Sequence, residues 1–211
     1  PVRFIGNRSS GKQGYAIAAA LAQAGADVTL VSGPVALPAP DGVRVVRVET
    51  AEQMLAACEA ALPVDIAVCA AAVSDYAPYR IEKNKIKKDR NKTPQFIDLK
   101  ENPDVLQRLS TPGAARPSLV VGFAAETEDL LDNAAAKRLK KGCDWLLAND
   151  VGSENIFGAD ENHVYLVTDS GIVEWERAGK RDVAERLVRE ICDFMNEEHH
   201  DRSDRNRPDA A

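Results

Sequence analysis

A glycine- and serine-rich stretch near the amino terminus constrains the fold of this chain more than any other segment. It reads GNRSSGKQG over residues 6–14, after the apolar residues 2–5 and before the alanine-rich residues 16–23. This order predicts a strand, a tight turn and a helix, which directs backbone N–H groups and the positive end of the helix dipole to one point. Glycines let a ligand approach the backbone, and serine hydroxyls donate hydrogen bonds. We therefore interpret the stretch as a site for an anion, with phosphate as the commonest guest.

The stretch departs from two standard nucleotide-binding motifs. The spacing of Gly6, Gly11 and Lys12 fits a Walker A loop, but Gln13 stands where that loop has its metal-binding hydroxyl. The first glycine interval is also too long for the dinucleotide fingerprint G-x-G-x-x-G. A glycine turn that serves packing alone is the alternative interpretation.

Strand-like apolar segments alternate with helical segments, which is typical of α/β proteins with a parallel sheet. We expect the first helix to open near Tyr15 and stop at Gly25, and a second helix to be capped by Thr50 and to end at residue 61. A third helix should begin with Asn102 as its cap and Pro103 in its first turn. The expected strands cover residues 27–33, 43–48, 65–72, 93–99, 118–127 and 144–150.

The carboxyl-terminal part of the chain has a different pattern. Residues 163–176 alternate with a period of two and predict an antiparallel hairpin at the sheet edge, and an amphipathic helix follows from Lys180. The fold we expect is a Rossmann-like, mostly parallel sheet flanked by helices, with this hairpin at the C-terminal end. It forms one domain over residues 1–200, followed by a disordered tail over residues 201–211.

Composition and charge argue against several classes of function. The formal net charge is −6, which disfavours general nucleic-acid binding. No apolar run approaches the ~20 residues that cross a bilayer. The four cysteines form no C-x-x-C pair, which indicates reduced thiols in a cytoplasmic protein, and three histidines are few for a transition-metal site. Because the chain begins at Pro1, we expect an excised or processed piece of a longer polypeptide.

A lysine-rich segment follows the expected strand 65–72. Residues 80–92, RIEKNKIKKDRNK, carry seven basic and two acidic side chains in a protein that is acidic overall. A solvated loop is the usual explanation of such a run. Here, however, the segment follows the carboxyl end of a strand, where ligands bind in open α/β sheets, and its ammonium groups would neutralise a polyphosphate. Asp75 lies beside it and suits a hydroxyl, a base edge or a cation, with a turn-forming aspartate as the equal alternative.

Two further features point to the same kind of ligand. The helix start at Asn102 and Pro103 offers N–H donors to an anion. Lys137 and Lys141 are four residues apart and share one helix face, although the helix dipole alone also explains basic residues near a C-terminus.

Taken in order, seven motifs resemble one enzyme family. They are FIGNRSSGKQG, CAAAVSDY, KIKK, NPDVL, VVGFAAET, AAAKRLKKG and ANDV. This set closely resembles the phosphopantothenate–cysteine ligase of bacterial coenzyme A synthesis, over roughly residues 2–196. The resemblance implies that CTP, with Mg²⁺, activates the carboxylate of 4′-phosphopantothenate as an acyl-cytidylate, and that the amine of L-cysteine then displaces CMP. It also implies a homodimer with shared sites, fused to an N-terminal flavin-dependent decarboxylase that alone would carry FMN.

The resemblance assigns site residues motif by motif. The residues expected to contact CTP are Asp75, Lys85, Phe123, Lys137, Lys141 and the helix start Pro103, Asp104, Val105 and Leu106. The phosphopantothenoyl group would contact Arg3, Asn7 and Ala72, and anion-site reasoning places its phosphate on Ser9, Ser10 and Gly11. Asn7 and Lys85 are the expected catalytic residues: Asn7 holds the acyl-cytidylate, and Lys85 lies closest to the reacting phosphate on a lid. Mg²⁺ would be held mainly by the triphosphate, with Asp75 as a candidate ligand. The hairpin over residues 163–176 is the candidate for part of the dimer contact.

Two other interpretations stay open from the residues alone. The opening βαβ pattern also fits a nicotinamide-dependent Rossmann oxidoreductase, although residues 30–33 at the end of the second strand contain no acidic residue to bind a ribose. A non-catalytic nucleotide-binding or interaction module is the third reading. The choice of CTP over ATP rests on the resemblance and not on any residue pattern.

Overall fold

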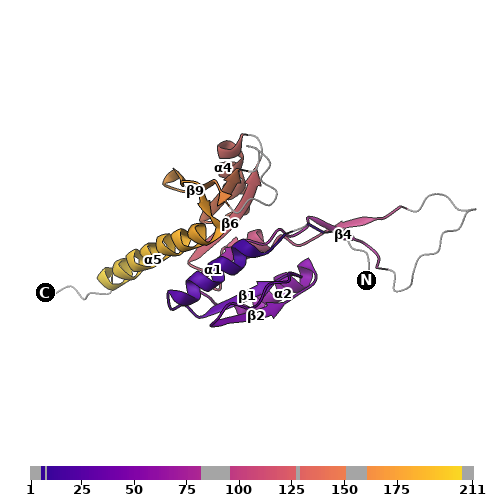
Figure 1. Ribbon diagram of the computed structural model, residues 1–211, viewed down its shortest axis with the longest axis horizontal. Coiled ribbons are helices and arrows are strands. Elements are labelled where there is room, and N and C mark those ends of the chain that lie inside the picture. Colours follow the sequence, from indigo (N-terminus) through magenta and orange to yellow (C-terminus); the bar gives the residue numbers. More distant parts are fainter. Residues whose placement is uncertain (1–5, 8, 82–95, 127–128, 151–160, 206–211) are drawn as a thin grey trace, which may run out of the picture.

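A five-stranded mixed sheet forms the centre of the molecule (Figure 1). The structure is a computed structural model, and it describes residues 6–7, 9–81, 96–126, 129–150 and 161–205. The strands in spatial order are β10 (Gly171–Glu174), β9 (Val164–Thr168), β7 (Trp145–Asp150), β6 (Leu119–Glu126) and β3 (Ile66–Cys69). β3, β6 and β7 run parallel, whereas β9 and β10 add an antiparallel hairpin at one edge. The expected fold class and hairpin are confirmed.

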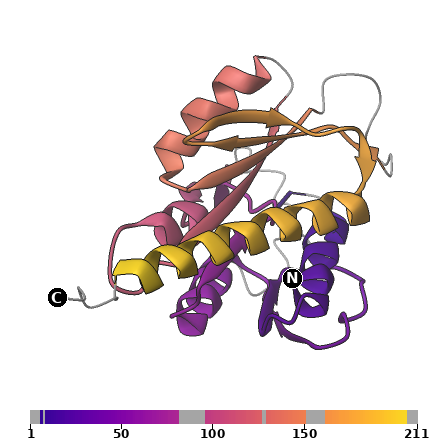
Figure 2. The same cartoon turned by 90° about the vertical axis from the view of Figure 1, so that its left-hand side faces the viewer.

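Helices cover both faces of this sheet because its central strands are apolar on both sides. On β6, Leu119 and Val121 belong to a core cluster with α1 (Lys12–Gln23) and α5 (Lys180–Arg205). Val120 and Ala124 point the other way, into a cluster with α4 (Leu130–Lys141) and Leu106 of α3 (Val105–Ser110). Figure 2 shows α5, in orange to yellow, crossing the foreground beside the indigo α1. Among the described residues, no helix combines the length and apolar character that a membrane crossing requires.

The amino-terminal half of the chain builds a smaller parallel pair. β1 (Val28–Ser32) pairs with β2 (Val43–Arg47), and α2 (Ala51–Ala61) follows with Thr50 as its cap, as expected, in a capping box with Gln53. The expected first strand, residues 2–5, lies outside the described residues. β3 is shorter than the predicted strand 65–72: its pairing with β6 ends at Cys69, and the chain then turns where the Val73 N–H donates to the Ala71 carbonyl.

Two helix boundaries differ from the expectation. α1 begins at Lys12, three residues before Tyr15, because Gly11 serves as its N-cap with φ 72°. α5 continues to Arg205, past the expected start of a disordered tail at residue 201. Its buried residues Val183, Leu187 and Ile191 anchor the helix, and extending an established helix needs no new nucleation. The domain boundary at residue 200 stays a prediction.

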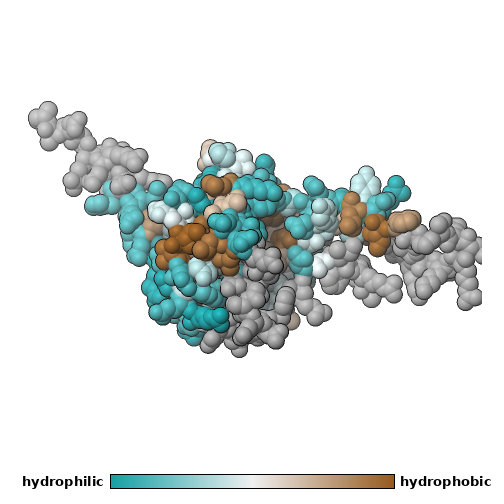
Figure 3. Space-filling model, turned by 90° about the horizontal axis from the view of Figure 1, so that it is seen from above, coloured by the Kyte–Doolittle hydropathy of each residue, from teal (hydrophilic) through white to brown (hydrophobic). Residues whose placement is uncertain are grey.

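A two-stranded antiparallel arm, which carries the label β4 in Figure 1, projects from the body of the molecule. It consists of β4 (Tyr76–Pro78), β5 (Leu99–Glu101) and the adjoining residues 79–81 and 96–98, so of the described part of the expected strand 93–99 only Leu99 is in a strand. The arm presents large apolar side chains to solvent, seen in brown where it projects in Figure 3. Four of them are 62% to 87% exposed, namely Tyr79, Ile81, Phe96 and Ile97. A smaller pair, β8 (Glu161–Asn162) and β11 (Ala178–Gly179), precedes α5.

Candidate functional site

The glycine-rich stretch is joined to the segment that follows β3. Asn7 Nδ2 donates a hydrogen bond to the Val73 carbonyl at 3.1 Å, across 66 positions of sequence. This contact places Asn7 within one residue of Ala72, so two of the predicted phosphopantothenate residues lie together. They lie beyond the carboxyl end of a parallel strand, which is where ligands bind in such sheets.

The serine turn has the features of an anion site. Ser9 Oγ accepts from the Gly11 N–H and Ser10 Oγ from the Lys12 N–H, both at 3.4 Å, and both serines are exposed. Bonds of this length are weak, so these N–H groups suit a stronger acceptor such as a phosphate oxygen. A Cβ at Gly11 would lie 2.9 Å from Val35 Cγ1, which makes glycine necessary there. The phosphate assignment to Ser9, Ser10 and Gly11 stays a prediction.

Gln13, which replaces the Walker A hydroxyl, is used for packing. Its Nε2 donates to the Lys180 carbonyl at 3.1 Å and joins the first turn of α1 to the first turn of α5. The departure from the Walker motif therefore has a structural explanation.

Asn102 does not cap a helix, which corrects the sequence-based expectation. Its side-chain Nδ2 donates to the Ser74 carbonyl and its backbone N–H donates to the Asp75 carbonyl, both at 2.8 Å. Asn102 thus continues the pairing of the arm and holds the turn that carries Asp75. α3 begins at Val105 instead, and Pro103 precedes the helix.

Asp104 is the N-cap of α3 and also pairs with a lysine of α4. Its Oδ1 accepts from the Gln107 N–H at 3.0 Å, and its Oδ2 forms an ion pair with Lys141 Nζ. Partial burial alone would raise the pKa of the Asp104 carboxyl, but the Gln107 N–H and the Lys141 ammonium together hold that pKa below its usual value. Lys141, with a side chain 25% exposed, is therefore directed at the start of α3, as the predicted nucleotide site requires.

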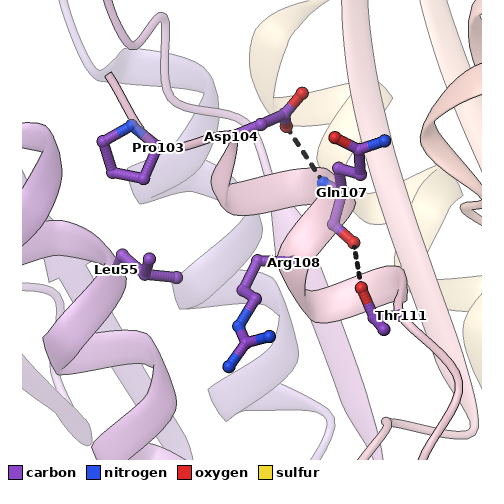
Figure 4. A pocket seen from close by; sticks show the side chains of 6 residues that line it. All are labelled: Leu55, Pro103, Asp104, Gln107, Arg108 and Thr111. Carbon is purple, nitrogen blue, oxygen red and sulfur yellow. Dashed lines mark hydrogen bonds between the residues drawn. The ribbon is translucent and has the colours of Figure 1, made fainter. Parts of the chain in front are cut away.

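A shallow pocket of about 310 Å³ lies beside this helix start (Figure 4). Pro103 and Asp104, two of the predicted CTP residues, form one part of its wall, and Leu55 of α2 faces them. The other lining residues are Gln107, Arg108 and Thr111. Val105 is buried and Leu106 is partly buried, both against core clusters, so only their backbone suits a ligand contact.

Gly122 is a requirement of this site that sequence reasoning missed. A Cβ on Gly122 would lie 2.7 Å from Leu106 Cδ2 and 2.9 Å from Leu146 Cδ1. Only glycine therefore allows α3 to pack this closely on β6. The sequence did contain a signal of this close approach, because a glycine inside a predicted buried strand often marks one. Phe123, the next residue, points to the opposite face of the sheet, against the cluster with α1 and α5.

The described contacts connect four segments of the predicted site: the glycine-rich stretch, residues 73–75, residues 102–104 and the end of α4. Asn7 donates to the Val73 carbonyl, and Asn102 donates to the carbonyl of the next residue, Ser74. Asp104, two residues after Asn102, forms the ion pair with Lys141. We call this set the polar junction: Asn7, Val73, Ser74, Asp75, Asn102, Asp104 and Lys141. Lys137 lies one helical turn before Lys141, whereas Phe123 is not brought to the same face as these lysines. Arg3 and Lys85 lie outside the described residues.

The described part of the chain contains no protein metal cage, and three of its cysteines are poor nucleophiles because they are buried or partly buried. No three His, Cys, Asp or Glu side chains gather there in a way that would hold a metal ion. Mg²⁺ commonly binds through one or two carboxylates plus substrate phosphates, so the residues present would suit an ion held mainly by a triphosphate, with Asp75 as the candidate protein ligand. Burial raises the pKa of the Cys69 thiol to about 12 and also raises the pKa of Cys58 and Cys143, so these thiols stay protonated.

Comparison with known proteins decides the family. The model of the "DNA/pantothenate metabolism flavoprotein C-terminal domain" family matches residues 1–195. This chain belongs to that family. Over 92% of its length it is 44% identical to the coenzyme A biosynthesis bifunctional protein CoaBC of Mycolicibacterium smegmatis, and over a similar share 40% identical to that of Haemophilus influenzae. These matches cover 50% and 48% of the two relatives, so the chain spans about half the length of the curated relatives it matches.

Two solved structures have the same architecture as this chain. The C-terminal domain of CoaBC superposes with a TM-score of 0.75 at 33% identity, over 93% of this chain and 89% of that one. A mutant of Cab2 in complex with phosphopantothenate-cysteine superposes with a TM-score of 0.71 at 18% identity, over 93% of this chain and 81% of that one. The Cab2 likeness shows a shared fold.

Proposed function

We propose that this chain is a CTP-dependent phosphopantothenate–cysteine ligase of coenzyme A biosynthesis. The observation that carries the proposal is the polar junction, which joins the glycine-rich stretch, the Asp75 turn and the lysine-bearing end of α4. The names of the CoaBC relatives support the pathway, and the ligand in the Cab2 complex supports the product.

In the first step a carboxylate oxygen of 4′-phosphopantothenate attacks the α-phosphorus of CTP. A P–O bond to the acyl group forms, the bond to the β-phosphate oxygen breaks, and pyrophosphate leaves with its electron pair. This displacement needs positive charge around the triphosphate, which Lys137, Lys141 and Lys85 would supply. Bound Mg²⁺ would add charge neutralisation there, with Asp75 as its protein ligand beside the phosphate oxygens.

In the second step the free amine of cysteine attacks the acyl carbon of the acyl-cytidylate. The C–N bond forms, the C–O bond to CMP breaks, and the amine proton passes to water. Asn7 suits the task of holding this intermediate, because its carboxamide has two N–H groups and the bond to Val73 uses one. An acyl oxygen placed beside the second N–H would be fixed for attack.

We further propose that the chain acts as a cytoplasmic homodimer and that an N-terminal flavin decarboxylase, which carries the FMN, completes the protein. The apolar arm supports a dimer. Its side chains Ile81 and Phe96 are 77% and 87% exposed, and exposed apolar side chains that cluster on one surface commonly mark a protein–protein contact. The hairpin, our sequence-based candidate for the contact, offers Ile172 and Val173 at 42% and 50% exposure. The arm is the stronger candidate.

Pyrophosphate release tests the proposed activity. The purified protein is mixed with Mg²⁺, 4′-phosphopantothenate and L-cysteine, and CTP or ATP is added. We expect pyrophosphate and CMP in equal amounts with CTP, and product of the mass of phosphopantothenoylcysteine. Absence of pyrophosphate with CTP would refute the proposal, and tight NADH binding in a parallel fluorescence titration would favour the oxidoreductase reading.

A further inference from the structure

Three successive backbone carbonyls around Asp75 accept hydrogen bonds from two asparagines. The Val73 carbonyl accepts from Asn7 Nδ2 at 3.1 Å, and the Ser74 carbonyl accepts from Asn102 Nδ2 at 2.8 Å. The Asp75 carbonyl accepts from the Asn102 backbone N–H at 2.8 Å. The peptide groups on both sides of Asp75 are therefore held in place, and with them the direction in which its side chain leaves the backbone.

Asn102 contributes two of these three bonds, and they differ in kind. The backbone bond extends the β4–β5 ladder, whose last described pair is Tyr76 with Glu101, so almost any residue would provide it. The bond to Ser74 needs a side-chain donor of the length of a carboxamide. The hydrogen bond to Ser74 therefore depends on the residue type at position 102, whereas the backbone hydrogen bond of the ladder does not.

The other half of the same carboxamide is left without a partner in the described part of the chain. Asn102 Oδ1 is buried and accepts no hydrogen bond there. A buried acceptor without a donor is unfavourable, and an apolar side chain of similar size would avoid that loss. The Asn102 carboxamide therefore acts through its N–H group, which bonds to Ser74, while its oxygen adds no hydrogen bond among the described residues.

Asn102 also stands two residues before Asp104, which holds Lys141. The segment 102–104 therefore fixes an acidic turn at one end and a lysine at the other. A nucleotide with a bound divalent cation suits both groups: the Asp75 carboxylate would contact the cation, and the Lys141 ammonium group would contact the phosphates.

We propose that Asn102 is a positioning residue for nucleotide binding, which acts through the Ser74–Asp75 peptide and not through contact with substrate. The proposal rests on the proposed ligase function. In it, Asn102 aligns the Asp75 carboxylate with the cation–triphosphate group, while the binding of cysteine, which enters after the first step, does not depend on Asn102.

The variant Asn102→Asp tests this role, because aspartate has the same shape and lacks the amide N–H. At neutral pH its carboxylate would face the Ser74 carbonyl, and we expect the KM for CTP to rise about tenfold while the KM for cysteine changes less than about twofold. Burial beside a carbonyl raises the pKa of an aspartate, so acidic pH should restore a protonated donor. The ratio of variant KM to wild-type KM for CTP should then shrink as the pH falls.

Two further variants complete the experiment. Asn102→Ala removes the amide without adding charge, so it should show the CTP defect without recovery at acidic pH, and it serves if Asn102→Asp does not fold. Asn196→Asp, on an exposed position of α5, makes the same chemical change elsewhere and should alter neither KM. Thermal unfolding of each protein accompanies the kinetics.

Each outcome decides between roles. A lower melting temperature with an unchanged KM for CTP in both Asn102 variants would make Asn102 structural only and overturn the inference. An equal rise in KM for CTP and cysteine would do the same. A wild-type protein that releases no pyrophosphate from CTP would overturn the proposed function together with this inference, whereas an active wild type with unaffected variants overturns the inference alone.

Discussion

Asp104 caps the first turn of α3 with one carboxylate oxygen and holds Lys141, the last residue of α4, with the other. One side chain therefore both begins a helix and sets the position of a cation from a second helix. The two roles can be separated by substitution, because asparagine caps a helix as well as aspartate does and carries no charge.

We expect Asp104→Asn to lose only the partly exposed ion pair, about 0.5–1 kcal/mol of unfolding free energy. Asp104→Ala should lose the cap in addition, about 1 kcal/mol more. Urea unfolding of the two variants measures both terms. Glu59→Ala is the control, because its ion pair with Arg108 is exposed on both sides and should contribute little. Equal stability of the asparagine and alanine variants would contradict the capping role.

The same residue predicts a pH dependence of stability. The pKa of Asp104 is lower in the folded protein than its usual 3.8, so the folded state favours the ionised form. The stability that the pair contributes is present above pH 3.8 and is lost as the pH falls through the lower folded pKa. The difference in unfolding free energy between wild type and Asp104→Asn should therefore vanish in acid. A difference that persists at pH 2, on the order of its neutral value, would speak against this charge effect.

Gly122 should tolerate no side chain. Gly122→Ala places a methyl group against Leu106 and Leu146, and we expect a loss of about 1–3 kcal/mol. Gly113→Ala is the matched control, since a Cβ there meets nothing within 4 Å, and it should change stability by less than about 0.5 kcal/mol. Because Leu106→Ala vacates the space, the double variant should lose less than the sum of the single changes. If the losses in unfolding free energy of the two single variants add up fully in the double variant, the added methyl group does not clash with Leu106.

The two proposed catalytic residues should fail at different steps. Lys85→Gln should block formation of the acyl-cytidylate, so that neither pyrophosphate nor CMP appears. Asn7→Ala should still release pyrophosphate but accumulate the acyl-cytidylate, because the second step lacks its anchor. Rapid quench with mass spectrometry distinguishes the two, and normal product formation without intermediate in Asn7→Ala would refute the role of Asn7.

The arm should decide the oligomeric state. Phe96→Ser and Ile97→Ser remove exposed apolar groups near its tip, and we expect the dimer to dissociate in sedimentation velocity experiments. Leu139→Ser is the control, since Leu139 is 72% exposed on α4, away from the arm. Dissociation by the control and not by the arm variants would move the interface to the α4 side.

Local sequence patterns sufficed for most elements, because each depends on neighbours in the chain. The Thr50 capping box and the apolar period of α5 are complete within a few turns of sequence, so both were predicted correctly. Because asparagine followed by proline is also the usual pattern at a helix start, the prediction of a helix cap was wrong at Asn102. Its actual partners, Ser74 and Asp75, are separated from it by the whole arm, and no local pattern contains that contact.

By itself the sequence determined the alternation of strands and helices, the glycine-rich turn and the residues that carry charge near it. Only the tertiary structure decided that Asn7 meets Val73, that Asn102 holds the Asp75 turn, and that Lys141 is directed at Asp104. The physical reason is that helices and turns form from interactions over three or four residues, whereas these contacts join segments 28 to 66 residues apart. Such contacts therefore depend on how the sheet places the ends of its strands.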